Sequence, residues 1–146
     1  MAKVINNIDE LSSSIQLIMK DMIDRMAKKV YETLNFYLKM YYESYTPQYY
    51  RRQYDFLHSA IKVNAKVIRN QIVAYVYIDT DFMSQYYQAS GIQVADWANQ
   101  GLHGGQKLGI NTPHVWNDTM RDMVENDVLL NEAVAYLKSK GFMVRD

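Results

Sequence analysis

The sequence predicts an α+β fold: a long N-terminal amphipathic helix, a small sheet based on an antiparallel β-hairpin, and C-terminal helices packed on that sheet. Three observations lead to this prediction. Apolar residues recur in steps of three and four over the first 41 positions, as on one face of a helix. Two later segments alternate between their faces around a short polar turn, as the strands of a hairpin do. Two further helical patterns near the C-terminus follow capping residues.

The first element is a helix that we expect to begin near Ile8 and to end by about Tyr45. Asn7 with Glu10 three positions later is spaced as in a capping box. Pro47 cannot continue a helix, and it disfavours helical geometry in the residue before it. The apolar stripe between these signals consists of Ile8, Leu11, Ile15, Ile18, Met22, Met26, Val30, Leu34, Tyr37 and Tyr41. These signals predict that residues 1–45 hold one long amphipathic helix, from about Ile8 to about Tyr45.

The length of this helix has a consequence for assembly. About 35 residues at roughly 1.5 Å each span roughly 50 Å, whereas a compact chain of this size has a diameter near ~40 Å. A straight helix would therefore extend beyond its own domain, and another subunit or another protein would have to cover part of its stripe. A kinked helix that lies wholly on its own sheet is the alternative. On the polar face, Asp21 with Arg25 and Asp24 with Lys28 are spaced for ion pairs.

Residues 46–61 form a joint rich in tyrosine and arginine, and residues 61–79 form the predicted hairpin. Six of the fourteen residues from Tyr41 to Tyr54 are tyrosine, so the segment offers large rings with polar tips. We expect a short helix or an irregular turn over 48–59, and a left-handed Asn70 in the hairpin turn. The first strand is predicted to place Ile61, Val63, Ala65 and Val67 on one face. The second is predicted to place Ile72, Ala74, Val76 and Ile78 on one face and Val73, Tyr75 and Tyr77 on the other.

Residues 80–116 are expected to hold a short helix and a glycine-rich loop, and residues 117–146 the C-terminal helices and tail. Ser90 can cap a helix over 92–100 that Gly101 ends. The loop contains Gly101, Gly104, Gly105 and Gly109, so we expect it to be mobile or shaped by a partner. Caps at Asn117 and at Asn126 or Asp127 predict two more helices, with Gly141 as the final stop. The tail 142–144 could add an edge strand.

Length, charge and cysteine content exclude several classes. A chain of 146 residues is the size of one domain, so residues 1–146 are expected to form a single unit. Sixteen basic residues balance sixteen acidic ones, which gives no overall attraction to nucleic acid or to a membrane surface. There is no cysteine, so disulfides and thiol catalysis are excluded. The longest apolar run, 72–78, is too short to span a bilayer, so we expect a soluble protein made in the cytoplasm.

Residues that could carry catalysis are few and badly spaced for it. His58, His103 and His114 share no zinc-binding spacing. The loop 101–107 resembles a phosphate-binding loop only weakly, because Gln106 and Leu108 replace residues which that loop requires. We therefore expect no catalytic residue, no cofactor, no metal and no small-molecule substrate. A small hydrolase or metal enzyme using the histidines is an unfavoured alternative.

Charge is distributed unevenly along the chain. The joint and hairpin carry an excess of cations, and the C-terminal helices carry an excess of acids. The cations are Arg51, Arg52, Lys62, Lys66 and Arg69, and the acids are Asp118, Asp122, Glu125, Asp127 and Glu132. A head-to-tail ring could place these two regions against each other; equally, both could be solvated faces. A third possibility is a nucleic-acid-binding module, because stacked tyrosines and guanidinium groups bind single strands.

The joint also resembles a known family. Tyr45, Pro47 and Tyr49, followed by Arg51 or Arg52 and then by Leu57 and Ser59, are similar to a motif in head-tail joining or tail completion proteins of tailed bacteriophages. The order after the motif is similar as well. It comprises a hairpin, the strand end VYIDTDFM, the loop Gly101-Leu102-His103-Gly104 and a C-terminal helix that ends at Gly141. Gln53 departs from the motif, in which threonine is usual at this place.

The resemblance implies a non-enzymatic subunit of the virion at the junction of head and tail. Such a connector would assemble into a homo-oligomeric ring and would contact other phage head and tail proteins. It would have no membrane partner, and DNA would meet it only by passing through the ring. By this resemblance, the residues expected to serve assembly are Tyr45, Pro47, Tyr49, Arg51, Arg52, Leu57, Ser59, His103 and Gly104.

Overall fold

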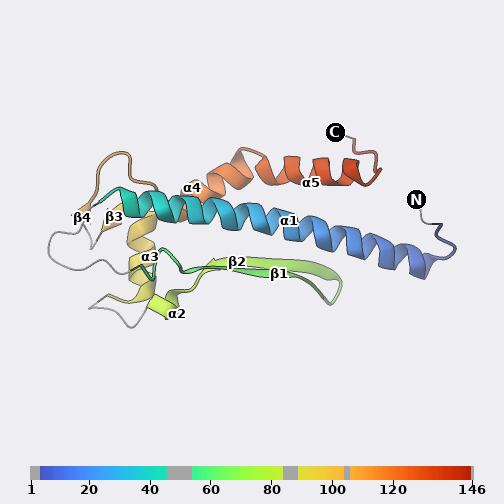
Figure 1. Cartoon of the computed structure of the whole chain (residues 1–146), viewed down its shortest axis with the longest axis horizontal. Coiled ribbons are helices and arrows are strands. Elements are labelled where there is room, and N and C mark those ends of the chain that lie inside the picture. Colours follow the sequence, from blue (N-terminus) through green and yellow to red (C-terminus); the bar gives the residue numbers. More distant parts are fainter. Residues whose placement is uncertain (1–3, 46–53, 84–88, 104–105, 146) are drawn as a thin grey trace.

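A computed structural model describes residues 4–45, 54–83, 89–103 and 106–145 of the chain. The long helix α1 (Ile8–Glu43) forms the spine of the molecule (Figure 1). The hairpin of β1 (Ala60–Ile68) and β2 (Gln71–Ile78) runs along one side of α1. The helices α4 (Val115–Met120), η1 (Arg121–Glu125, a π-helix) and α5 (Val128–Ser139) run along the opposite side. The predicted α+β class is confirmed.

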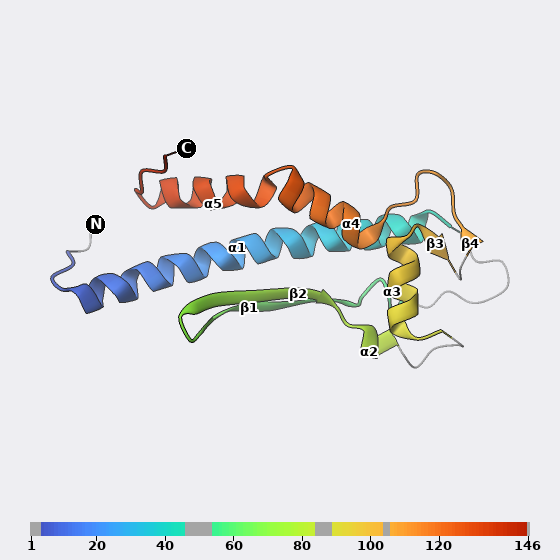
Figure 2. The same cartoon turned by 180° about the vertical axis from the view of Figure 1, so that it is seen from behind.

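The remaining elements gather at the C-terminal end of α1 (Figure 2). They are α2 (Thr80–Met83), α3 (Gly91–Asn99) and a second small antiparallel pair, β3 (Leu102–His103) and β4 (Gln106–Lys107). The predicted glycine-rich loop therefore contains this strand pair. The predicted cap of α3 is present, because Ser90 and Gln93 form a reciprocal capping box. Gly101 follows the helix with φ 70°, a conformation that glycine adopts without strain.

Helix α1 is continuous over 36 residues, which corresponds to roughly 54 Å. Its start is capped as expected: Asn7 Oδ1 accepts a hydrogen bond from the Glu10 amide at 2.8 Å. The Glu10 carboxylate in turn accepts a hydrogen bond from the Asn6 amide at 3.1 Å. Beyond the hairpin and α5, the N-terminal turns of α1 project past the rest of the fold (Figure 1). The helix does not lie wholly on its own sheet, which the alternative of a kinked helix required.

The hydrophobic core lies near the C-terminal half of α1, where this helix meets the start of the hairpin, α3 and α4. Leu34 and Leu38 are fully buried there. The rest of the buried cluster consists of Tyr37, Tyr41, Tyr42, Phe56, Ala60, Ala98 and Val115. The later part of the predicted apolar stripe therefore belongs to the core, whereas its first three residues, Ile8, Leu11 and Ile15, remain exposed.

The predicted face of the first strand is wrong because β1 contains a bulge. The register shifts between Val63 and Lys66, where two residues oppose Ala74 alone. An extra residue turns the following side chains to the other face of a strand. Ile61 and Val63 therefore lie on the outer face of the hairpin, while Ala65 and Val67 face α1. The two faces predicted for β2 agree with its pairing and burial, because Val76 and Ile78 pack on the core.

Three further predictions of local structure are wrong. Arg69, and not Asn70, has the left-handed conformation in the hairpin turn, with φ 55°. Helix α4 begins at Val115, two residues before the predicted cap, and the backbone N–H of Asn117 in its first turn donates to Asn99 Oδ1 at 2.8 Å. The tail Phe142–Val144 is described and forms no strand. For residues 48–59 the prediction is a short helix or an irregular turn, and the described residues 55–58 form a turn.

Of the two predicted ion pairs on α1, one is formed. Arg25 Nε lies 3.5 Å from the Asp21 carboxylate. The pair of Asp24 with Lys28 is wrong, because Lys28 pairs with Glu32 at 3.7 Å and Asp24 turns toward the hairpin. All these side chains except Asp24 are largely exposed, so the pairs contribute little to stability.

Candidate assembly site

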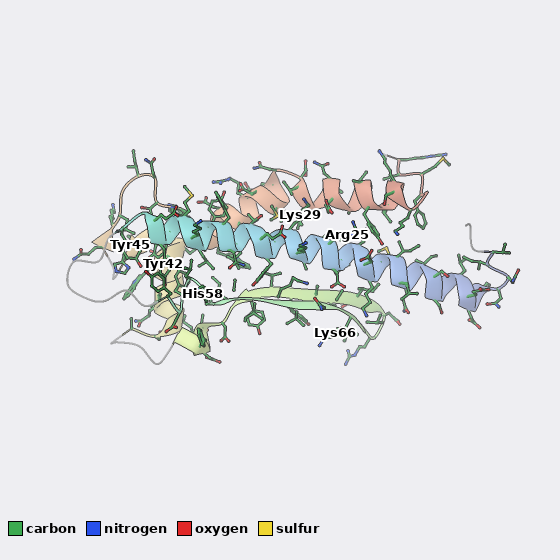
Figure 3. The ribbon with its side chains drawn as sticks, in the orientation of Figure 1. Arg25, Lys29, Tyr42, Tyr45, His58 and Lys66 are labelled. Carbon is green, nitrogen blue, oxygen red and sulfur yellow. The ribbon has the colours of Figure 1, made fainter. Side chains whose placement is uncertain are left out.

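The joint contains an aromatic cluster at the C-terminal end of α1. The Tyr45 ring stacks on the His103 ring with centroids 4.1 Å apart, which joins the end of α1 to β3. Tyr41 meets Phe56 edge to face at 5.7 Å, and Tyr42 stacks on Tyr54 at 5.9 Å. Figure 3 shows Tyr42, Tyr45 and His58 near one another at this end of the molecule. The tyrosine-rich sequence thus forms a packed contact between three separate segments.

Hydrogen bonds fix the same joint. The Tyr41 hydroxyl donates to the carbonyl of Leu102 at 2.7 Å, and the Leu57 amide donates to the Tyr42 hydroxyl at 3.2 Å. Ser59 is fully buried, and its hydroxyl donates to the carbonyl of Phe56 at 2.6 Å. Any effect of Ser59 on assembly would therefore act through the fold of the joint.

The structure brings four of the predicted assembly residues to this joint: Tyr45, Leu57, Ser59 and His103. Tyr45 and Leu57 pack against the buried core cluster. The other predicted positions, Pro47, Tyr49, Arg51, Arg52 and Gly104, lie outside the described residues. The role of all nine residues in assembly stays a prediction.

A second candidate surface lies at the opposite end of α1. A groove of about 380 Å³ runs between the first turns of α1 and the tip of the hairpin. Its apolar walls come from α1 on one side and from the last residues of β1 and the first residues of β2 on the other. The apolar side chains that line it are Ile8, Leu11, Ile15, Met19, Val67 and Ile72. Ile8 is 81% exposed and Leu11 is 44% exposed, so the groove is uncovered within one chain.

Sequence reasoning found only half of this groove. The periodic stripe and the helix length predicted that the start of α1 would need a cover. The wall from the hairpin was missed, because the alternation of residues does not show that Val67 and Ile72 lie against the first turns of α1.

Two polar clusters attach the C-terminal helices to α1. In the first, the Tyr37 hydroxyl donates to Asp122, while Arg121 lies 2.7 Å from Asp118 and 3.1 Å from Asp122. Burial, followed by the hydrogen bond to Asp122, raises the pKa of Tyr37 above its ordinary value. The adjacent carboxylates likewise raise the pKa of Arg121.

In the second cluster, the Tyr136 hydroxyl of α5 donates to the Asp21 carboxylate at 2.5 Å. This hydrogen bond is the main cause of a lowered pKa for Asp21, and burial is the main cause of a raised pKa for Tyr136. Arg25 lies over the Tyr136 ring at 4.7 Å, and Lys29 lies 3.6 Å from Glu132. Figure 3 shows Arg25 and Lys29 on the side of α1 that faces α5.

The described residues contain neither a metal-binding cluster nor a helix that could span a membrane. Within the described ranges, no group of three histidine, cysteine, aspartate or glutamate side chains lies close enough to hold a metal ion. His103 stacks on Tyr45, His114 contacts the carbonyl of Asn99 at 3.0 Å through Nδ1, and His58 is exposed. None of the helices in the described part of the chain has the length and hydropathy needed to cross a bilayer.

The described residues therefore form an elongated α+β structure built on one long helix, with candidate contact surfaces at both ends of that helix. The family model named YomN matches residues 7–139, and the chain belongs to the YomN family. This is a phage-derived family, so the expected bacteriophage origin is supported. No curated protein and no solved structure matches the chain.

Proposed function

We propose that this protein is a structural subunit of a phage head-tail junction, a connector or tail completion protein that forms a ring and joins capsid to tail. Its partners in this proposal are copies of itself and other head and tail proteins, and its place is the virion. It performs no catalysis. The phage-derived family supports the context of this proposal, and the resemblance of the joint motif supports the class.

The observation that carries the proposal is the uncovered apolar groove at the start of α1. The apolar side chains of Ile8, Leu11 and Ile15 are exposed to water. They lie on the part of α1 that projects beyond the rest of the fold. A contiguous exposed apolar surface of this kind is typical of a site for protein contact. A subunit that must bind neighbours in a particle requires such a surface, whereas an isolated monomer would lose solubility through it.

Two experiments test the proposal. The first measures the solution mass by light scattering after gel filtration over a concentration series, with negative-stain microscopy of the heaviest species. A closed oligomer seen as rings is the expected result. The second removes the gene from the phage, which should give separate heads and tails that a supplied copy of the protein rejoins. A protein that stays monomeric, together with intact particles from the deleted phage, would contradict the proposal.

The nucleic-acid alternative is weakened by the burial of two tyrosines in the cluster it relies on, although Tyr54 in the same stretch is 51% exposed. Tyr41 and Tyr42 have 2% and 5% of their surface exposed, so their rings are not available to stack on bases. Titration with single-stranded DNA at several salt concentrations checks this alternative. Tight binding that weakens steeply with salt would favour it over the connector proposal.

A further inference from the structure

We propose that the outer face of the hairpin in one copy docks on the η1 to α5 corner of the next copy. This inference rests on the proposed function, and it names the two surfaces that would meet between neighbouring subunits of the ring.

The outer face of the hairpin is apolar with a cationic end. Ile61 opposite Tyr77 and Val63 opposite Tyr75 form adjacent cross-strand pairs on this face. Tyr75 and Tyr77 are 47% and 45% exposed, although such pairs normally stabilise a sheet by packing. A two-stranded sheet is marginal by itself. The hairpin packs one face on α1 and leaves the other apolar face in water.

The cations lie toward the tip of this same face. Lys66 pairs with Val73 on it, and Figure 3 shows Lys66 on the side of the hairpin away from α1. Arg69 follows in the exposed turn. Residues 60–78 contain no acidic residue, so the face has one sign of charge.

The corner between η1 and α5 has the opposite charge and its own exposed apolar groups. Glu125 and Asp127 are exposed there. Val124 is 53% exposed and Leu130 is 59% exposed. The neighbouring acids Asp118, Asp122 and Glu132 already contact Arg121 or Lys29. Glu125 and Asp127 are therefore the acids of this arm placed to meet an external cation.

The position of the two surfaces selects a second copy as the partner. They lie on opposite sides of α1 in both views (Figures 1 and 2), so they cannot meet within one chain. Two different patches that complement each other on identical subunits form a heterologous interface, and such interfaces build rings when the rotation closes. A hairpin facing another hairpin would bring two cationic faces together, which is unfavourable. The docking of unlike surfaces places Lys66 and Arg69 near Glu125 and Asp127, with the tyrosines over Val124 and Leu130.

Charge reversal in two full-length variants tests the interface. The variant K66E/R69E makes the hairpin acidic, and E125K/D127N makes the corner basic. Asparagine is chosen at 127 because it tolerates the left-handed conformation of that residue, which has φ 58°. The matched control K39E/K138E changes the net charge as much as K66E/R69E at exposed positions elsewhere. Circular dichroism shows whether each variant is folded.

Each interface variant alone should associate about tenfold or more weakly than the wild type, while the control should assemble normally. An equimolar mixture of the two interface variants should assemble again, because each acidic hairpin then meets a basic corner. If the wild type forms rings and the corner variant does so equally well, the interface is wrong and the connector proposal stands. Loss of assembly in the control, or no recovery in the mixture, would also overturn the interface. A wild type that is monomeric at every concentration would overturn the interface, and the connector proposal would fall with it if the phage without the gene still gave intact particles.

Discussion

The Asp24 carboxylate on α1 accepts a hydrogen bond from the amide of Ala65 in β1 at 2.5 Å. Ala65 lies at the bulge, where the ladder between the two strands is interrupted. A bulge leaves a backbone group without its strand partner, and a buried amide without a partner is costly. Asp24 supplies that partner from the helix, so it fixes the position of the hairpin along α1.

Replacing Asp24 by alanine should lower the free energy of unfolding by about 1–3 kcal/mol, because the Ala65 amide loses its acceptor. Urea denaturation measures the change. Asp24→Asn keeps a carbonyl oxygen at the same place and should lose less. Equal stability of the alanine variant and the wild type would show that water replaces the carboxylate at no cost.

The core prediction concerns two neighbouring positions on α1. Leu34 is fully buried, whereas Phe36 is 60% exposed. Leu34→Ala should lower the free energy of unfolding by about 2–5 kcal/mol, because it leaves a cavity in the core. Phe36→Ala is the matched control and should change it by roughly 0.5 kcal/mol or less. Thermal unfolding compares the two, and similar losses would contradict the placement of the core.

The contact of Tyr136 with Asp21 predicts a pH-dependent effect of Tyr136→Phe. Because the pKa of Asp21 is lowered in the folded protein, its contribution to folding stability is fully present above the pKa of the unfolded chain, about 3.9. That contribution is lost as the pH falls through the lower pKa of the folded protein. Because the pKa of Tyr136 is raised in the folded protein, its contribution to folding stability is fully present below a pH of about 10. That contribution is lost as the pH rises through the higher pKa of the folded protein.

The urea midpoint of Tyr136→Phe should therefore lie below that of the wild type at pH 7. The gap should narrow as the pH falls below about 4. A gap of the same size at pH 7 and pH 2 would show that the hydrogen bond to Asp21 does not stabilise the docking of α5.

The groove at the start of α1 predicts a specific loss of assembly. Leu11→Glu and Ile15→Glu, each made alone, place a charge in the apolar wall of the groove. Each should raise the protein concentration needed for assembly by about tenfold or more, because the charge would be desolvated on docking. The measurement is solution mass by light scattering. Ser13→Glu adds the same charge at an exposed position that does not line the groove, and it should assemble like the wild type.

Tyr49 and Arg52, in the segment between α1 and β1, lie outside the described residues, and the family resemblance predicts their role in assembly. The paired change Tyr49→Ala and Arg52→Ala should weaken assembly, since the family resemblance gives both residues a place in the contact surface. The same light-scattering series measures the effect. Unchanged assembly at micromolar concentration would remove these two residues from the predicted site, while leaving the groove and the hairpin interface to be judged separately.

The long helix and the short helix α3 could be predicted from sequence because their signals are local. Periodic apolar positions and the caps at Asn7 and Ser90 act within a few residues of each other. The projection of α1 beyond the domain followed from its length alone. These features need no knowledge of what packs where.

The missed features depend on contacts between distant parts of the chain. The bulge in β1 forms where Asp24, 41 residues away, supplies an acceptor. The π-helix at Arg121–Glu125 accompanies the contact of Asp122 with Tyr37, which is 85 residues away. The groove needed both the projecting helix and the turned Val67, so the sequence could predict only the wall from α1.

The start of α1 also predicts a gradient of local stability along one helix. Residues 12–14 are three serines, which are poor helix formers, and the apolar side chains around them gain little from packing within the chain. Amide hydrogen exchange should therefore be fast in the first turns and slow from Met22 onward. Docking would hold these first turns in the helix, so they would reach their full stability only when the subunit joins a neighbour. The entropy lost in that ordering would keep free subunits weakly associated until many contacts form together.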